Sequence, residues 1–201
     1  MRGLRLLLMG CGLALPVGPG VAGALADSGS GTSGGAVFMP ATTLLSPPVQ
    51  ISTPAQPIVQ GSRAKIINGL AYAPSEAPLQ VQRAIWAGNA IRHKPYVYGG
   101  GHGAWISSGY DCSGSVSYVL HAAGLINISM DSGQMMGWGE AGLGQWITVY
   151  ANPGHAFVQI AGIRLDTSAE GDRHPARGSG PRWRPVMRRT PGYTARHPLG
   201  F

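Results

Sequence analysis

Cysteine and charge are both scarce in this sequence. Of its 201 residues, two are cysteine, at positions 11 and 112, and 11% are charged, against a usual share of about 25%. So few cysteines exclude a disulfide-dense scaffold and a zinc site with only cysteine ligands. Glycine replaces much of the missing charge, because its 32 residues are roughly twice the average usage. The length fits one domain with flanking segments and excludes two or three full domains.

The first 26 residues have the pattern of a secretory signal peptide. Two arginines precede an apolar stretch from Leu6 to Val17, and the small residues of Ala24-Leu25-Ala26 offer a cleavage site. A transmembrane helix would need about 20 apolar residues, whereas glycine and proline interrupt this stretch from Gly10 onward. We therefore expect cleavage after Ala26, and a secreted or cell-envelope protein without a stable membrane span.

A lipoprotein is the alternative for this N-terminus. Leu8-Met9-Gly10-Cys11 would be its lipid-attachment box, but only ten residues precede Cys11 and the apolar run before it is very short. Removal of the signal peptide would leave Cys112 as the only cysteine. Exported proteins usually keep cysteine for pairing, so one exported thiol needs a chemical explanation, with a buried structural cysteine as the default reading.

Residues 27–62 are expected to form a spacer, and residues 63–201 the folded domain. Of the 36 spacer residues, 20 are Gly, Ser, Thr or Pro, and the only charge is at Asp27. This composition is typical of a flexible linker. Within the domain, apolar residues recur at helical spacing from Val81 to Ile91, which predicts an amphipathic helix that ends before Pro95.

A second helix is expected to begin at Cys112. Asp111 is a good N-cap, apolar residues recur at helical spacing up to Ala123, and Gly124 provides a stop. A cysteine in the first turn lies at the positive end of the helix dipole, which favours the thiolate and lowers the pKa of the thiol. Cys112 is therefore a candidate nucleophile. The preceding glycine-rich run, residues 96–103, lacks the features of a phosphate-binding loop.

Three β-strands are expected toward the C-terminus. The period of the apolar residues changes to two over residues 146–150, 155–160 and 163–167, and turn residues separate these segments. Short strands joined by tight turns predict an antiparallel meander.

The last two of these strands bring a histidine and a carboxylate together. If Ala161-Gly162 is a two-residue loop, Ile160 pairs with Ile163, and His155 becomes a diagonal neighbour of Asp166 on one face. A bulge would shift that register. Together with a cysteine at a helix start, the pair makes a candidate nucleophile, base and orienting residue.

Three motifs resemble one known family. They are Tyr96-Val97-Tyr98-Gly99-Gly100, Tyr110-Asp111-Cys112-Ser113-Gly114 and Gly154-His155-Ala156-Phe157-Val158. They are similar to those of the NlpC-type family of papain-like cell-wall cysteine peptidases, over roughly residues 80–170. The opening of a helix by Asp-Cys-Ser-Gly is the most specific part of the resemblance.

The resemblance implies an α+β, papain-like fold whose catalytic helix packs on an antiparallel β-sheet. It further implies an exported cysteine endopeptidase that hydrolyses peptide bonds in peptidoglycan stem peptides, commonly between D-glutamate and a diamino acid. Cys112 matches the nucleophile, His155 the general base, and Tyr96 a tyrosine that helps hold the oxyanion. The third polar residue of the family is often histidine, whereas Asp166 stands at the equivalent place here. Aspartate can still accept a hydrogen bond from the histidine ring.

Two other classes of function remain open. One is a catalytically silent accessory protein that binds the cell wall, and the other is an amidase or acyltransferase that uses the same triad. The remaining histidines lack the paired spacing of metal ligands, so we expect no metal and no cofactor. Among them, His102 in the glycine-rich run is the one we would mutate.

Seven arginines lie between residues 173 and 196, interleaved with Trp183 and Tyr193. Such a run can contact nucleic acid, but an exported protein meets anionic wall polymers first. We expect a solvated arginine-rich face on an extended segment that wraps the domain, with one late strand. The expected partners are peptidoglycan stem peptides and not nucleic acid, and the protein is expected to be a monomer.

Overall fold

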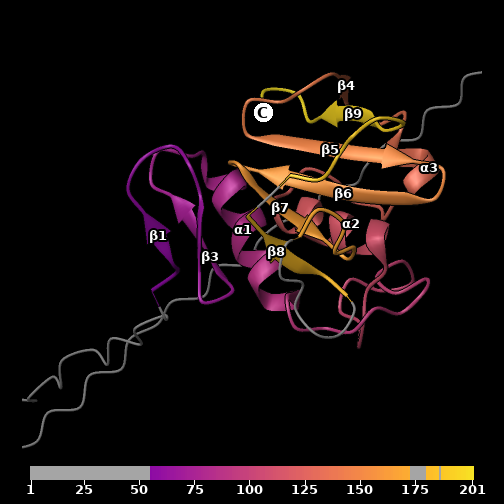
Figure 1. Ribbon diagram of the computed structural model, residues 1–201, viewed down its shortest axis with the longest axis horizontal. Coiled ribbons are helices and arrows are strands. Elements are labelled where there is room, and N and C mark those ends of the chain that lie inside the picture. Colours follow the sequence, from indigo (N-terminus) through magenta and orange to yellow (C-terminus); the bar gives the residue numbers. More distant parts are fainter. Residues whose placement is uncertain (1–54, 173–179, 186) are drawn as a thin grey trace, which may run out of the picture. The chain divides into compact units, whose positions relative to one another are not determined.

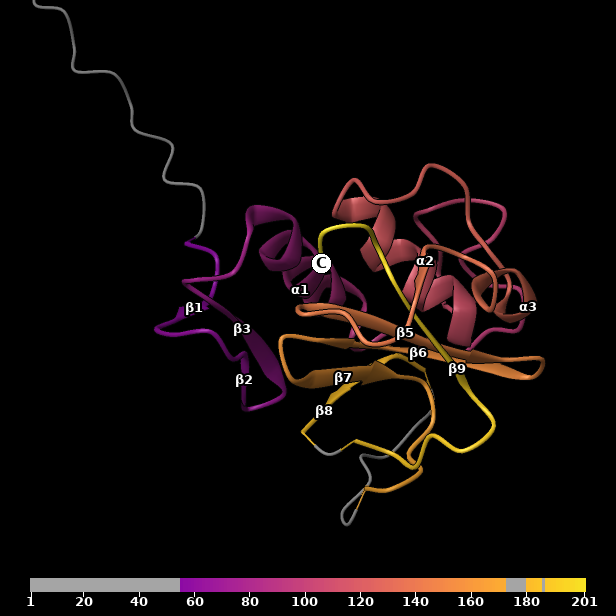
Figure 2. The same cartoon turned by 90° about the horizontal axis from the view of Figure 1, so that it is seen from above.

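The chain combines α-helices with antiparallel β-sheet in the computed structural model, which describes residues 55–172, 180–185 and 187–201 (Figure 1). The helices lie on one face of the main sheet (Figure 2). This confirms the expected α+β class with helices packed on an antiparallel sheet. The expected signal peptide and most of the expected spacer lie outside the described residues. Among the described helices, none has the length and apolar character needed to cross a membrane.

The main sheet has the strand order β4-β9-β5-β6-β7-β8, and all of its neighbouring strands are antiparallel. The C-terminal residues belong to this sheet, because β8 forms one edge and β9 lies between β4 and β5. The strands are β4 (Glu140–Ala141), β5 (Ile147–Asn152), β6 (His155–Ile160), β7 (Ile163–Asp166), β8 (Arg182–Arg184) and β9 (Thr194–His197).

The hairpin between β6 and β7 has the expected register. Ile160 pairs with Ile163, and the two residues between them, Ala161 and Gly162, have φ angles of 46° and 91°. Positive φ at both positions is typical of a two-residue hairpin turn, because it matches the twist of the strands. No bulge shifts the pairing, so the placement of His155 near Asp166 follows from this turn.

A separate three-stranded sheet has the order β1-β3-β2, formed by β1 (Ile58–Val59), β2 (Lys65–Ile67) and β3 (Leu70–Pro74). β1 pairs with β3 in parallel. It lies inside the segment 27–62 that was expected to be spacer, so the folded part begins before residue 63. A strand of two residues is too short to show an apolar period in the sequence. It forms because these residues pair with the edge of β3.

Helix α1 (Leu79–Ile91) forms as predicted, with Val81, Ala84, Ile85, Gly88 and Ile91 buried. Its polar residue Asn89 is also buried, and its side chain joins three elements. The amide Nδ2 donates to the Ala71 carbonyl at 2.8 Å, and Oδ1 accepts from the Ala71 N–H at 2.9 Å and from Trp183 Nε1 at 3.0 Å. Because buried amide groups are costly without partners, Asn89 fixes β3 and β8 against α1.

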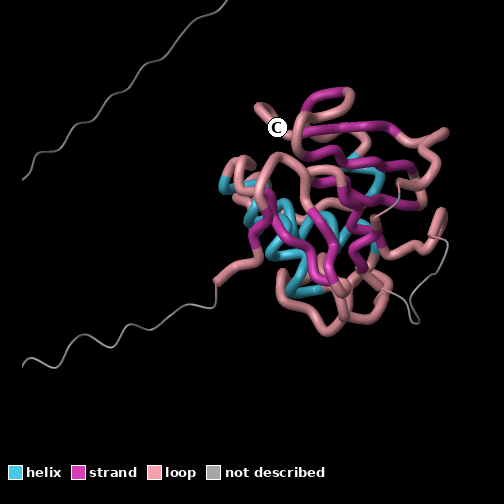
Figure 3. Tube along the Cα trace, turned by 60° about the vertical axis from the view of Figure 1, so that its left-hand side comes forward, coloured by secondary structure: helices cyan, strands magenta, loops and turns pink. Residues whose placement is uncertain are grey.

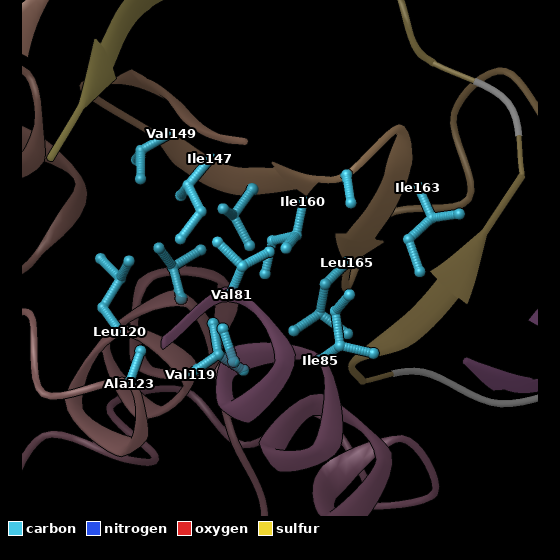
Figure 4. Packing of buried hydrophobic residues seen from close by; sticks show 14 of the residues in the cluster. Val81, Ile85, Val119, Leu120, Ala123, Ile147, Val149, Ile160, Ile163 and Leu165 are labelled. Atoms are coloured by element: carbon cyan, nitrogen blue, oxygen red, sulfur yellow. The ribbon is translucent and has the colours of Figure 1, made fainter. Parts of the chain in front are cut away.

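Helix α2 (Cys112–Ala122) begins and ends as predicted, with Asp111 as N-cap and a left-handed Gly124 just after it. The short helix α3 (Ser132–Met135) follows. Apart from the isolated pairing of Tyr96 with Tyr110, the connection between α1 and α2 contains neither helix nor strand. Figure 3 distinguishes the helices, strands and loops of the chain by colour. The core lies between the helices and the sheet, where side chains from α1 and α2 face those of β5, β6 and β7 (Figure 4).

The C-terminal segment differs from the prediction of a solvated arginine-rich face, which is wrong for Arg184 and Arg188. Only 5% of Arg184 and 9% of Arg188 is exposed. The segment also contributes two strands, β8 and β9, in place of one. Both arginines form ion pairs with acidic residues of the fold. The sequence alone does not show whether a charged residue is buried or which residue it pairs with. Here the pairings join residues that are far apart in the chain, so the prediction could not include them.

We expect Gly88→Ala to destabilise the protein. A Cβ at position 88 would clash with the indole of Trp183, which its hydrogen bond to Asn89 holds in place. Overpacking costs about 1–3 kcal/mol, and better helix propensity returns up to about 1 kcal/mol, so the net loss should be about 1–2 kcal/mol. Thermal unfolding followed by circular dichroism should show Tm lowered by several degrees. The control is Gly137→Ala, whose Cβ would meet its nearest neighbour at 3.8 Å; an equal Tm loss there would contradict the proposed clash.

Candidate active site

Cys112 is the first residue of α2, and the N-cap Asp111 organises the backbone around it. One carboxylate oxygen of Asp111 accepts from the Gly114 N–H at 2.7 Å, which closes the first turn. The other accepts from the Gly99 N–H at 2.9 Å. The predicted cap therefore also fastens the glycine-rich loop to the start of the helix.

Gly114 is required by how closely this loop approaches the helix. A Cβ at position 114 would clash with the Gly100 carbonyl oxygen, which is backbone and has little room to move. That carbonyl also accepts a hydrogen bond from the Asp111 N–H at 3.2 Å. The Asp-Cys-Ser-Gly motif thus needs glycine at its last position for a steric reason. Without a side chain there, the loop can approach the helix closely and form one wall beside Cys112.

His155 is the first residue of β6, directly after a tight turn. The Asn152 side chain fixes this turn by accepting from the backbone N–H of Gly154 at 3.0 Å and of His155 at 2.8 Å. The ring atom Nε2 lies 2.9 Å from Oδ1 of Asp166. A carboxylate can only accept, so Nε2 carries the proton and Nδ1 is left to bond the thiol of Cys112.

Asp166 lies at the end of β7, and none of it is exposed. Its Oδ1 also accepts from the Ser168 N–H at 2.8 Å. Burial and two donors on one oxygen hold this carboxylate in a single orientation. The sequence-predicted residues Cys112, His155 and Asp166 are therefore brought into one chain of hydrogen bonds.

The thiol and the imidazole change each other's pKa. Burial raises the pKa of the Cys112 thiol, but hydrogen bonds with His155 and with the Ala156 backbone, and the charge of His155, outweigh burial and lower the pKa below its ordinary value. Burial lowers the pKa of His155, but hydrogen bonds with Asp166 and Cys112, and their charges, raise it to about 9. Between these two pKa values the pair exists as thiolate and imidazolium.

A cleft of about 770 Å³ opens beside Cys112. Tyr96 lies on its wall and is 39% exposed. Burial and the nearby charges of Cys112 and Asp111 raise the pKa of Tyr96, so its phenol stays protonated and can donate. The lining residues are Tyr96, Tyr98, Gly99, His102, Asp111, Cys112, Ser113, Asp131, Ser132, Gly133, Pro153 and Gly154.

The backbone N–H of Cys112 has no hydrogen-bond partner among the described residues. It lies at the N-terminus of α2, where the helix dipole favours negative charge. An oxyanion that forms on a group attacked by the thiolate would find this N–H within the same cleft. Together with the Tyr96 phenol, it offers two donors to developing negative charge.

His102 also lines the cleft. Its Nε2 lies 3.1 Å from Oδ1 of Asp111 and 3.2 Å from Oγ of Ser113. The sequence marked this histidine only by its place in the glycine-rich run, and nothing local indicated its partners. Asp131 and Ser132, which also line the cleft, carried no signal in the sequence beyond ordinary helix capping.

Of the other histidines in the described residues, His93, His121 and His197 do not line the cleft. His121 lies in the last turn of α2, as predicted, where its Nδ1 contacts the Ile126 carbonyl at 3.0 Å and its ring stacks on Trp105. Within the residues that the structure describes, no group of three or more His, Cys, Asp and Glu side chains could hold a metal ion. Cys112, His155 and Asp166 supply the site with a thiol, an imidazole and a carboxylate.

A search against models of known protein families found no match to this chain, and a search of curated proteins found none either.

Proposed function

We propose that this protein is an exported cysteine peptidase that hydrolyses peptide bonds in peptidoglycan stem peptides. The observation that carries the proposal is the chain of contacts from the Cys112 thiol through His155 to the buried carboxylate of Asp166. A thiol at a helix start, paired with a histidine that a carboxylate orients, is the arrangement needed for nucleophilic acyl transfer. The resemblance of the three motifs to NlpC-type peptidases, with their papain-like fold, supplies the substrate class.

Acylation begins from the thiolate and imidazolium pair. The Cys112 sulfur attacks the carbonyl carbon of the stem peptide, and the carbonyl oxygen becomes an oxyanion that the Cys112 N–H and the Tyr96 phenol stabilise. As the tetrahedral intermediate collapses, the C–N bond breaks and His155 gives its Nδ1 proton to the leaving amine. The products of this half-reaction are a free amine and a thioester on Cys112.

Deacylation returns the site to its starting state. His155, now neutral, takes a proton from a water molecule that attacks the thioester carbonyl. The C–S bond then breaks, a carboxylic acid leaves and the thiolate and imidazolium pair is restored. Asp166 keeps the ring in one tautomer through both half-reactions, because its hydrogen bond holds the proton on Nε2.

The cleft is compatible with a peptide substrate that carries an amino group. Its lining residues include Asp111 and Asp131 and neither lysine nor arginine. The basic C-terminal arginines Arg184 and Arg188 are buried, so they do not supply the wall-binding surface that the sequence suggested. An acidic cleft favours the diamino residue of a stem peptide over its carboxylates.

Mass spectrometry of digested peptidoglycan tests this proposal. Purified peptidoglycan would be incubated with the protein, and the released fragments compared with those from Cys112→Ala. A peptidase should release fragments with one new amine and one new carboxylate at a bond between two amino acids. The identity of that bond also names the substrate.

The other function classes predict different products. An amidase would separate the stem peptide from the sugar, and an acyltransferase would join the acyl group to an added amine. A binding protein would give the same fragments as Cys112→Ala and would co-sediment with peptidoglycan. Any of these three patterns would overturn the peptidase proposal.

A further inference from the structure

Asp166 belongs to a network of ion pairs that also contains three arginines and two further acidic residues, Glu170 and Asp172. Arg164 Nη2 lies 2.9 Å from Asp172, and Arg184 also pairs with Asp172. Arg188 pairs with Asp166 and with Glu170. The three guanidinium side chains are at most 6% exposed, so their charges are matched inside the protein and not by water.

Arg188 differs from the other two arginines in how it contacts Asp166. Its Nη1 donates to Oδ2 of Asp166 at 3.3 Å, on the opposite oxygen from the one that contacts His155. Arg164 Nε approaches Oδ2 at 3.6 Å without a hydrogen bond, and Arg184 Nε donates to the Asp166 carbonyl. Within the described residues, Arg188 is thus the only arginine that donates a hydrogen bond to this carboxylate.

The ring of Tyr193 connects the same arginine to the histidine. The Arg188 guanidinium lies 5.3 Å from the ring centroid of Phe157 and 5.2 Å from that of Tyr193. Tyr193 in turn meets the His155 ring edge-on, at 6.4 Å and 85°. Cations over aromatic faces are attracted by them, most strongly where water is excluded. Arg188 is therefore held in place from two sides.

We propose that Arg188 is a positioning residue that, through Asp166, sets the orientation of His155 toward Cys112. The inference rests on the proposed function and deepens it, because it makes the C-terminal segment part of the catalytic machinery. Arg188 is not among the residues that line the cleft. With Oδ2 anchored by Arg188 and Oδ1 by Ser168, the carboxylate cannot rotate away from the imidazole.

The experiment compares Arg188→Met with Arg189→Met, the same change at an exposed neighbour. Two experiments are made on each variant: steady-state kinetics on peptidoglycan fragments give kcat and KM, and alkylation of Cys112, which requires no substrate, gives a pH profile. Arg188→Met should lower kcat about 10- to 100-fold with little change in KM, since small misplacements of catalytic groups cost rates of this order. Its alkylation profile should move toward that of Asp166→Asn, while Arg189→Met matches wild type.

A double-mutant cycle identifies the route of the effect. If Arg188 acts through Asp166, adding Arg188→Met to Asp166→Asn should cause no further loss of kcat. Full multiplication of the two losses would overturn the proposal, as would a wild-type kcat and alkylation profile in Arg188→Met.

Removal of a buried charge can prevent folding, because it leaves its partners unpaired. If Arg188→Met does not fold, Arg188→Lys carries the test, since lysine keeps the charge but not the fork of donors. An intermediate loss of kcat and a partly shifted alkylation profile support the proposal, and wild-type values of both overturn it.

The two proposals fail separately. If the wild-type protein does not cleave peptidoglycan, the peptidase proposal fails, yet a shifted alkylation profile in the Arg188 variant still supports its positioning role. If the wild-type protein cleaves and the Arg188 variant is unchanged in both measurements, only the positioning role fails.

Discussion

Replacing Cys112 by alanine should abolish cleavage of purified peptidoglycan and leave the fold intact. The thiolate forms the only covalent bond between protein and substrate in the proposed mechanism. Loss of such a nucleophile lowers kcat by a factor of about 10⁶. The side chain is small, and its removal leaves the cap of α2 unchanged, because the cap is made by Asp111. Release of new amines from peptidoglycan measures the loss, and circular dichroism with thermal unfolding checks the fold.

Cys112→Ser is a more conservative test of the same role. Serine keeps a hydrogen-bonding group at the start of α2, but its hydroxyl is not ionised by the neighbouring imidazole. We expect a loss of activity nearly as large as that of the alanine variant. Cleavage at the wild-type rate by either variant would show that Cys112 is not the nucleophile.

Replacing His155 by glutamine should lower peptidase activity by about 10²- to 10⁴-fold, the range expected for loss of a general acid and base. It should also raise the pKa of the Cys112 thiol. Burial, which raises that pKa, remains in the variant, whereas the hydrogen bond and the charge of His155, which lower it, are lost. Alkylation of Cys112 should therefore need a higher pH than in the wild-type protein.

The same pair determines how wild-type activity depends on pH. Activity should rise as the pH passes the lowered pKa of the thiol, because the thiolate is then formed. It should fall as the pH passes about 9, the pKa of His155, because the proton for the leaving amine is then lost. The expected profile is a bell whose alkaline limb lies near pH 9.

His93→Gln is the matched control for His155, because His93 is an exposed histidine in the connection between α1 and α2. It should keep the wild-type alkylation profile and the wild-type rate. An unchanged thiol pKa in His155→Gln would contradict the thiolate and imidazolium pair. It would also remove the main physical support for nucleophilic catalysis at this site.

Much of the local structure could be predicted from the sequence. The spacing of Val81, Ile85 and Ile91 places α1 correctly, and the order Asp111, Cys112 and Gly124 places both ends of α2. Each of these signals is local, because a helix period and a cap depend only on residues a few positions apart. The proximity of His155 and Asp166 followed in the same way from one two-residue turn.

Features that depend on distant pairing could not be predicted. β1 is a strand only because β3 offers it an edge, so the composition of the segment suggested a spacer. The partners of His102 lie across a loop, and those of Arg188 lie at the end of β7 and in the loop that follows it. No period or motif encodes such contacts.

The sequence by itself determined where Cys112, His155 and Asp166 would lie, because each sits at the start or end of a regular element. Only the tertiary structure decided how the C-terminal arginines are used. From the sequence alone, a run of arginines is expected to be solvated. In the fold, acidic residues lie close to these arginines, and a buried arginine with an acidic partner is far more favourable than a buried arginine without one. Through those partners Arg188, from the end of the chain, comes to lie behind Asp166, opposite the cysteine at the start of α2.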